Sequence, residues 1–288
     1  MERPYSLIEL DEVDSTNNYL RRLDAPDSPR PLLVTAEYQT AGRGADTNSW
    51  ESARGENLLF SLRVQPQALP ARHMFAISET AALALVTALK GFLEGQGARG
   101  KEQEITSCPN NSPAPRPLPL APCPLPLAPN QSFTIKWPND IYYADSKVAG
   151  ILIENDLQGA FVRHSTIGIG LNINQRRFLS DAPNPRSLAD IVGHDLERRT
   201  VLERFMESFL HLFGQITDGA PDILSALHQR YKSRLFRFGQ EHSYSDQGGT
   251  FRATLVDVEP SGHLVLRDTE GRLRRYAFKE VRFLINPL

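Results

Sequence analysis

Two lysines occupy strand ends within one short stretch of this chain, where an ammonium group could neutralise an anion. Lys136 closes an extended segment before Trp137-Pro138, because proline cannot donate to a sheet ladder and biases the preceding residue toward extended backbone. Lys147 opens the apolar run 148–153 after a polar turn. Each ammonium must reach water or meet a negative group. The pattern predicts either an anion-binding pair or two lysines that extend into solvent at a sheet edge.

The segment 167–174 has the clearest strand pattern. Its odd positions are all Ile or Leu, so one face belongs to the core, whereas its even positions are Gly168, Gly170, Asn172 and Asn174. Glycines weaken a strand, so their use on one face predicts a bare floor that a flat ligand can approach, with Asn172 at its end to bond that ligand. The alternative is an ordinary edge strand with a polar outer face.

The loop 42–50 combines glycines, exposed backbone amides and Arg43, which together can wrap an anion. It contains neither a Walker A motif nor the glycine pattern of dinucleotide-binding folds. Trp50 closes this polar loop. Its large ring predicts packing on a bound ligand or, equally, anchoring of the loop against the sheet.

The patterns that flank these residues predict a mixed α/β domain over 1–234. Strands are expected at 6–11, 32–39, 58–65, 134–137, 141–143, 148–153, 161–165 and 167–174, and longer helices at 74–93, from 200 onward and at 222–233. The segment 98–132 repeats PLPLAP and is expected to be an extended insertion. Short strands separated by glycine turns over 235–288 predict a small C-terminal barrel.

Composition narrows the function classes. The chain has 288 residues, a formal charge of −2 and two cysteines, both in the proline-rich insertion. Because the sequence has no Lys/Arg-rich block, nucleic-acid binding is not expected. Because no signal peptide or membrane span is recognised, the protein is expected to be cytoplasmic. The spacing of histidines and cysteines predicts no metal site, and no Ser/His/Asp order suggests hydrolysis.

The polar faces of several predicted strands gather into one candidate cleft, with neutral hydrogen-bonding groups at one end and cations at the other. Such a cleft suits a ligand with an uncharged, amide-like head and an anionic tail. Its predicted members are Ser15, Thr16, Asn17, Gln39, Arg43, Lys136, Lys147, Gly168, Gly170 and Asn172.

Five motifs in this order resemble those of the biotin protein ligase family. They are Asp14-Ser15-Thr16-Asn17, the segment 37–44 (EYQTAGRG), Lys136-Trp137-Pro138-Asn139-Asp140, the segment 147–152 (KVAGIL) and the segment 168–174 (GIGLNIN). The resemblance covers about 15–174, and the C-terminal strands are similar to the family's SH3-like domain. It implies a class II synthetase-like α/β ligase core with a mixed central sheet and helices, followed by a small SH3-like β-barrel.

By this resemblance, biotin and MgATP form biotinyl-5′-AMP and pyrophosphate, and a lysine of a biotin carboxyl carrier protein domain then takes the biotin. Two anions must meet, so charge neutralisation matters more than acid–base groups. Lys136 and Arg43 are the implied catalytic residues, and Asn139 and Asp140 are expected to orient Lys136 or a phosphate-bound Mg²⁺. The implied biotin-binding residues are Ser15, Thr16, Asn17, Gln39, Arg43, Gly44, Ala45 and Lys136, and the implied ATP-binding residues are Trp50, Asn139, Asp140, Lys147 and Asn172.

One departure from the family pattern and two alternatives remain open. Ala45-Asp46-Thr47 stands where the family often carries another cation, which predicts weaker retention of biotinyl-AMP. A lipoate or octanoate ligase would use the same scaffold, and a non-catalytic biotin-sensing module is the other alternative. A DNA-binding repressor is not expected, because only fourteen residues precede Ser15. A monomer or a homodimer is expected, without a membrane partner.

Overall fold

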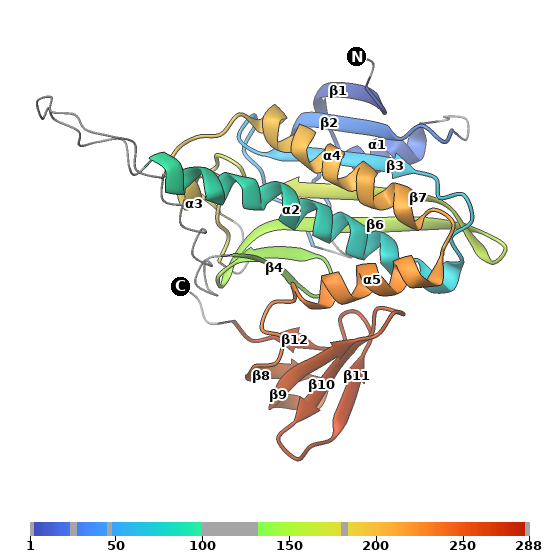
Figure 1. Cartoon of the computed structure of the whole chain (residues 1–288). Coiled ribbons are helices and arrows are strands. Elements are labelled where there is room, and N and C mark those ends of the chain that lie inside the picture. Colours follow the sequence, from blue (N-terminus) through green and yellow to red (C-terminus); the bar gives the residue numbers. More distant parts are fainter. Residues whose placement is uncertain (1–2, 24–27, 45–47, 100–131, 180–183, 286–288) are drawn as a thin grey trace, which may run out of the picture.

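The computed structural model describes residues 3–23, 28–44, 48–99, 132–179 and 184–285. Ala45 and most of the predicted proline-rich insertion lie outside these residues. A seven-stranded mixed sheet forms the larger part (Figure 1), with the order β1-β2-β3-β7-β6-β5-β4. Its strands are β1 (Ser6–Val13), β2 (Leu32–Gln39), β3 (Leu58–Val64), β4 (Phe133–Lys136), β5 (Asp140–Tyr143), β6 (Ser146–Gln158) and β7 (Phe161–Leu171). Only β1 and β2 pair in parallel among the described strands of this sheet.

Three long helices cover one face of this sheet (Figure 1): α2 (Phe75–Arg99), α4 (Arg198–Ile216) and α5 (Pro221–Lys232). The short helices are α1 (Thr16–Arg22), η1 (Ala71–His73) and α3 (Leu188–Val192). The apolar stripe predicted for 74–93 is buried at Ile77, Ala81, Leu85 and Leu89. The stretch 71–93 is long and apolar enough to cross a membrane, but 67% of its most apolar window is buried within the protein. This burial is typical of a core helix.

The alternation predicted for 167–174 places β7 as expected. Ile167, Ile169 and Leu171 are almost fully buried in the core under the helices. Side chains alternate between the faces of a strand, so Gly168 and Gly170 lie on the opposite face. Gly170 pairs with Gly150 of β6, which places two glycines side by side on that face. The predicted mixed α/β fold is confirmed, and the sheet offers a flat patch opposite its helix layer.

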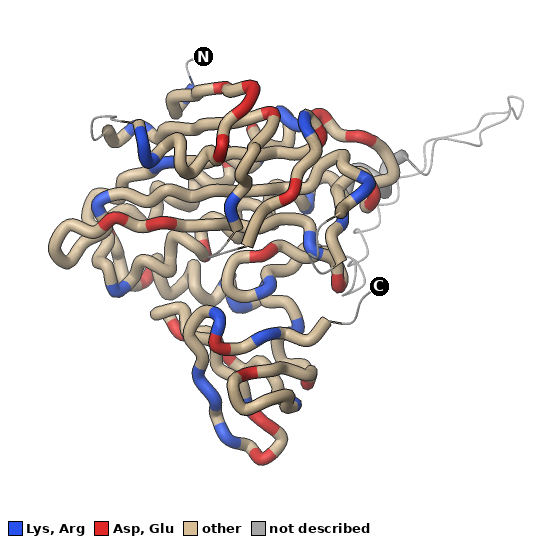
Figure 2. Tube along the Cα trace, turned by 180° about the vertical axis from the view of Figure 1, so that it is seen from behind, with Lys and Arg blue, Asp and Glu red and all other residues tan. Residues whose placement is uncertain are grey.

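A second sheet follows α5. It contains β8 (Glu241–Asp246), β9 (Gly249–Val258), β10 (Leu264–Asp268), β11 (Leu273–Tyr276) and β12 (Arg282–Phe283), in the order β11-β10-β9-β8-β12. An SH3-like barrel remains a prediction for this part, as does the domain boundary at 234. Basic and acidic residues are interspersed along both sheets when they are viewed from behind (Figure 2).

The second sheet is anchored on the first through the predicted Lys136–Asp140 motif. Trp137 is buried, and its indole Nε1 donates a hydrogen bond of 2.9 Å to the carbonyl oxygen of Gly262. The Trp137 ring also meets Phe278 edge-on, with ring centroids 6.3 Å apart. Gly262 has φ +92°, and a Cβ there would lie 2.8 Å from the Phe75 ring, so this contact requires glycine. The motif therefore sits at the junction of the two sheets.

Candidate functional site

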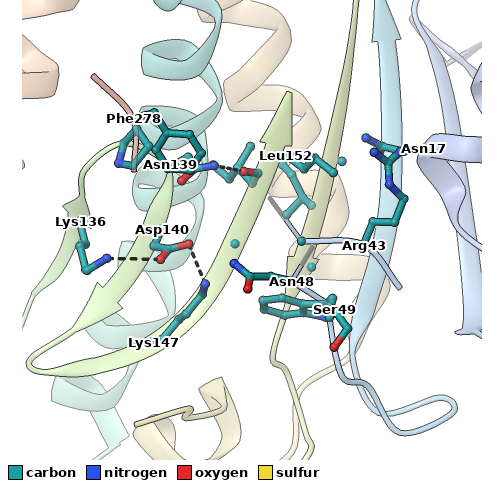
Figure 3. Close-up of a pocket in the computed structure, with 18 of the residues that line it drawn as sticks. Asn17, Arg43, Asn48, Ser49, Lys136, Asn139, Asp140, Lys147, Leu152 and Phe278 are labelled. Carbon is teal, nitrogen blue, oxygen red and sulfur yellow. Dashed lines mark hydrogen bonds and ion pairs between the residues drawn. The ribbon is translucent and has the colours of Figure 1, made fainter. Parts of the chain in front are cut away.

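A cavity of about 540 Å³ opens on the glycine-bearing face of the large sheet. Its walls come from the start of α1, the loop 42–50, the turn between β4 and β5, strands β6 and β7, and the segment 278–285 of the second sheet. Asn17 and Arg43 lie on one side of this cavity and Lys136, Asp140 and Lys147 on the other (Figure 3). The structure therefore brings most of the predicted site residues together around one hollow.

The first side is a set of neutral groups, which we call the neutral end: Ser15, Thr16, Asn17 and Gln39. The backbone N–H and the hydroxyl of Thr16 donate to Gln39 Oε1 over 2.7 and 3.1 Å. The hydroxyl of Ser61 on β3 lies 2.7 Å from Thr16 Oγ1 and 2.5 Å from Asn17 Oδ1, so its one proton is shared between these two oxygens. A Cβ at Gly168 would overlap the Asn17 amide. Glycine at 168 thus leaves room for Asn17 to lie against the sheet.

The other side, the cationic end, consists of Lys136, Lys147 and Asp140. Asp140 lies between the lysines, with Oδ1 2.7 Å from Lys147 Nζ and Oδ2 3.7 Å from Lys136 Nζ. The Lys136 ammonium also lies 5.1 Å from the ring centroid of Phe283. Burial lowers the pKa of Lys136. The charge of Asp140 acts to raise this pKa, and the charge of Lys147 acts to lower it further. This end therefore consists of two partly buried ammonium groups that share one carboxylate.

Hydrogen bonds of the turn between β4 and β5 hold Lys136 and Asp140 in position. The Asn139 side chain donates to the carbonyl oxygen of Ile151, and Ile151 N donates back to the Asn139 carbonyl oxygen over 3.1 Å. The hydroxyl of Tyr231 on α5 donates to the carbonyl oxygen of Pro138 over 3.0 Å. Lys136 and Asp140 therefore lie at the two ends of a turn that is hydrogen-bonded to β6 on one side and to the helix layer on the other.

Arg43 lies at the neutral end rather than with the lysines. Its Nη1 donates to Asn18 Oδ1 over 2.9 Å, and its two Nη atoms lie 3.2 and 3.4 Å from the Glu154 carboxylate oxygens. The prediction that all cations gather at one end is wrong for this residue, because Glu154 provides a negative partner on the opposite side. Gly44 also lines the cavity, and its N donates to the Asn48 carbonyl oxygen over 2.7 Å.

Trp50 covers the glycine patch. A Cβ at Gly150 would lie 3.1 Å from the Trp50 ring, and one at Gly170 would overlap the indole. Lys147 Nζ is 5.7 Å from the ring centroid. The floor predicted to be bare is thus covered by the protein's own side chain, as in the alternative of a loop anchored on the sheet. The indole nevertheless lines the cavity and offers it an aromatic surface.

Comparison with known proteins places this site in a family. The profile of the "Biotin/lipoate A/B protein ligase family" matches residues 9–172, which is more than half of the chain. The chain belongs to this family.

Similar proteins support the same placement. The chain is 28% identical to the biotin--[acetyl-CoA-carboxylase] ligase of Paracoccus denitrificans, over 91% of this chain and 95% of that protein. It is 26% identical to the bifunctional ligase/repressor BirA of Bacillus subtilis, over 94% of this chain and 72% of that protein. A biotin protein ligase from Aquifex aeolicus, solved with biotin and ATP, superposes with a TM-score of 0.69 at 23% identity, over 97% of this chain and 99% of that one. The structural likeness establishes the fold of this family member.

Asn172 is the predicted site residue that the structure does not bring to the cavity. It is buried, and it is not among the described residues that line the hollow. Its side chain donates over 3.4 Å to the carbonyl oxygen of Arg186, and its own carbonyl oxygen accepts from Leu188 N over 3.0 Å. Because β7 ends at Leu171, Asn172 has turned away to tie the strand end to the segment before α3.

Two contributions to the site escaped the sequence reasoning: Glu154, which bonds the cavity-lining residues Asn17 and Arg43, and the residues of the second sheet. Glu154 follows the predicted run 148–153 with the same parity as Gly150 and Leu152, so extending that alternation would have found it. The contribution of the second sheet left no local signal, because it depends on how the two sheets dock. These residues are Phe278, Lys279, Val281, Arg282, Phe283 and Ile285.

The described residues offer little to a resident metal ion. No group of three His, Cys, Asp or Glu side chains among them could hold one. Asp140 is the only acidic residue among the described cavity-lining ones, and both lysines lie beside it. This donor set fits a Mg²⁺ that arrives on a nucleotide and is held mainly by phosphate oxygens and water.

Proposed function

We propose that this protein is an ATP-dependent biotin protein ligase. The biotin carboxylate attacks the α-phosphorus of ATP, which forms biotinyl-5′-AMP and releases pyrophosphate. The amine of a carrier lysine then attacks the acyl carbon, which forms an amide and releases AMP. The observation that carries the proposal is the cavity that joins a neutral hydrogen-bonding end to a partly buried lysine.

The neutral end suits the ureido head of biotin. Ser15, Thr16, Asn17 and Gln39 supply amide and hydroxyl groups that can both donate to and accept from a cyclic urea. Thr16 is already bonded to Gln39, and Ser61 links Thr16 to Asn17, so little ordering is needed when biotin binds. In this orientation the valeryl chain runs along the sheet and directs its carboxylate toward Lys136.

The cationic end suits the phosphates. Lys136 neutralises the biotin carboxylate and the α-phosphate as they approach, because its ammonium is partly shielded from solvent and held beside Asp140. Arg43 holds the adenylate from the opposite side of the cavity. Lys147 and Asn139 bind the nucleotide, Trp50 packs on adenine, and Gly44, with Ala45 beyond the described residues, closes over biotin.

Asp140 has a second role in this proposal. It now pairs with both Lys136 and Lys147 and offsets part of their charge. When phosphates replace it beside the lysines, its carboxylate becomes available to the Mg²⁺ that ATP brings, directly or through water. The ion would supply further charge neutralisation on the phosphates.

The names of the relatives favour biotin over lipoate. The Paracoccus protein is named for biotin and acetyl-CoA carboxylase, so we propose a biotin carboxyl carrier protein of that or a related carboxylase as the acceptor, in the cytoplasm. The Bacillus relative is named as a repressor as well. We propose the ligase activity alone for this chain.

The experiment is to incubate the purified protein with MgATP, a carrier domain, and either biotin or lipoate, and to weigh the carrier. Biotinylation, with pyrophosphate released even before the carrier is added, is the expected result. If the carrier gains lipoate but not biotin, the protein is a lipoate ligase instead. A protein that binds biotin but releases no pyrophosphate would be a binding module.

The predicted weak retention of biotinyl-AMP rests on Ala45-Asp46-Thr47, which lies outside the described residues. It is tested by gel filtration of the loaded protein, which is expected to lose the adenylate. An adenylate that co-elutes without leakage would contradict it.

A further inference from the structure

Glu154 is the centre of the polar contacts on the Arg43 side of the cavity. It accepts from Asn17 Nδ2 over 3.0 Å and takes both Nη atoms of Arg43 over 3.2 and 3.4 Å. Arg21 Nη1 approaches its outer face at 3.5 Å. One carboxylate therefore joins a residue proposed to bind biotin to the residue proposed to hold the phosphate of the adenylate.

The geometry of this pair leaves part of Arg43 available for a ligand. A guanidinium has five N–H donors. Three are directed at described residues: two from Nη1, toward Asn18 and Glu154, and one from Nη2, toward Glu154. Nε–H and the second Nη2–H form the other edge of the fork, which can hold two oxygens of a phosphate. Glu154 can thus keep its bond while Arg43 binds the substrate.

A carboxylate at this position is expected to weaken the binding of anionic substrates, and its contribution to folding stability does not offset this. The proposed substrates are both anionic, so a negative group beside the phosphate-binding arginine weakens their binding. The Glu154 side chain is 29% exposed, and partly exposed ion pairs add little to stability. Orientation of Arg43 and Asn17 is a benefit that can offset this repulsion.

We propose that Glu154 is a positioning residue, which holds Arg43 and Asn17 in the relative geometry that the adenylation step requires. The inference rests on the proposed function. Glu154 does not touch the reacting atoms. It acts through Arg43, by fixing the plane and the height of the guanidinium above the sheet.

The test is Glu154→Gln, which keeps the shape and an oxygen for Asn17 but replaces the oxygen that faces Arg43 Nη2 with an amide nitrogen. The rate of pyrophosphate release is expected to fall about tenfold, the effect of one lost charge-assisted hydrogen bond. The dissociation constant of biotin should change by less than about twofold, because the Asn17 bond survives. Glu203→Gln, which removes an exposed partner of Arg199 on α4, is the matched control and should match wild type.

The decisive measurement repeats Glu154→Gln in an Arg43→Ala background. If Glu154 acts through Arg43, the second substitution should add less than about twofold to the loss caused by the first. An equal loss in both backgrounds would overturn the proposal, as would an unchanged or faster rate in the single variant. If the wild-type protein releases no pyrophosphate, the proposed function is contradicted, and this inference, which rests on it, is contradicted as well.

Discussion

The two ends of the cavity are built on different principles. At the neutral end, Thr16, Gln39, Ser61 and Asn17 are bonded to one another over 2.5 to 3.1 Å, and all of them belong to the large sheet or to α1 beside it. At the cationic end the groups are charged, and Phe283 of the second sheet lies against Lys136. One end is complete within one layer, and the other is completed by two parts of the chain.

This difference bears on how each end meets a ligand. A preformed hydrogen-bonding end can select a neutral head by shape and by donor and acceptor pattern, with little rearrangement. The cationic end is only partly neutralised by its own Asp140, because one carboxylate faces two lysines, and an incoming phosphate competes with this carboxylate. We expect binding at the neutral end to be largely independent of the exchange at the cationic end.

Lys136→Met separates the two ends most sharply. Without the ammonium, the two anionic substrates meet without neutralisation, and we expect kcat for pyrophosphate release to fall by about 10³-fold. Biotin should still bind within a few fold of wild type, because the neutral end is intact. Stopped-flow fluorescence and a pyrophosphate assay measure the two quantities. Arg199→Met, an exposed charge on α4, is the control. Equal losses of binding and turnover would contradict independent ends.

Gly170→Ala should damage the nucleotide side. Its Cβ would occupy the position of the Trp50 indole, so the ring must leave the sheet. We expect KM for ATP to rise about tenfold, the consequence of 1–3 kcal/mol of overpacking, with KM for biotin nearly unchanged. Initial rates at varied ATP and at varied biotin provide the measurement.

Gly168→Ala is its matched partner, two residues away on the same face. Its Cβ would displace the Asn17 amide instead, so KM for biotin should rise while KM for ATP stays close to wild type. If both variants raise the same constant, the assignment of the two ends is wrong.

Local pattern predicted the side of the sheet on which this site lies. The alternation in 167–174 identified the buried face and the glycine face, and both lysines were placed at strand ends by Pro138 and a polar turn. These features depend on neighbours in sequence, so single-chain periodicity records them.

What the sequence did not predict depends on contacts between distant segments. Arg43 is drawn toward Glu154, 111 residues away, and the sequence left open whether Trp50 would pack on a ligand or on the glycines that it covers. The approach of Phe283 to Lys136 requires the docking of the second sheet. Each of these contacts depends on residues that are distant in sequence and meet only in the folded chain.

Asp140→Asn tests the charge balance of the cationic end. Burial lowers the pKa of Lys136, and Asp140 counteracts this by stabilising the charged ammonium. Removing that charge lowers the pKa of Lys136 further, so the ammonium is lost at lower pH. The alkaline limb of the kcat profile should therefore move to lower pH, while the pH dependence of biotin binding does not change. An alkaline limb that stays in place would show that Asp140 does not set the charge of Lys136.

Tyr231→Phe is the mildest perturbation, because it leaves both ends in place and loosens only the turn behind one of them. Burial raises the pKa of Tyr231 well above its usual value, and the charge of Glu79 adds to this, so the hydroxyl remains a donor at any assay pH. Losing its bond to the Pro138 carbonyl oxygen should lower the free energy of unfolding by about 1 kcal/mol. Because that turn carries Lys136 and Asp140 but no neutral-end residue, kcat should fall a few fold with KM for biotin unchanged. Tyr38→Phe, whose ring lies under Arg54, is the control for removal of a hydroxyl. A loss of stability with kcat intact would mean that the turn is held well enough by Asn139 alone.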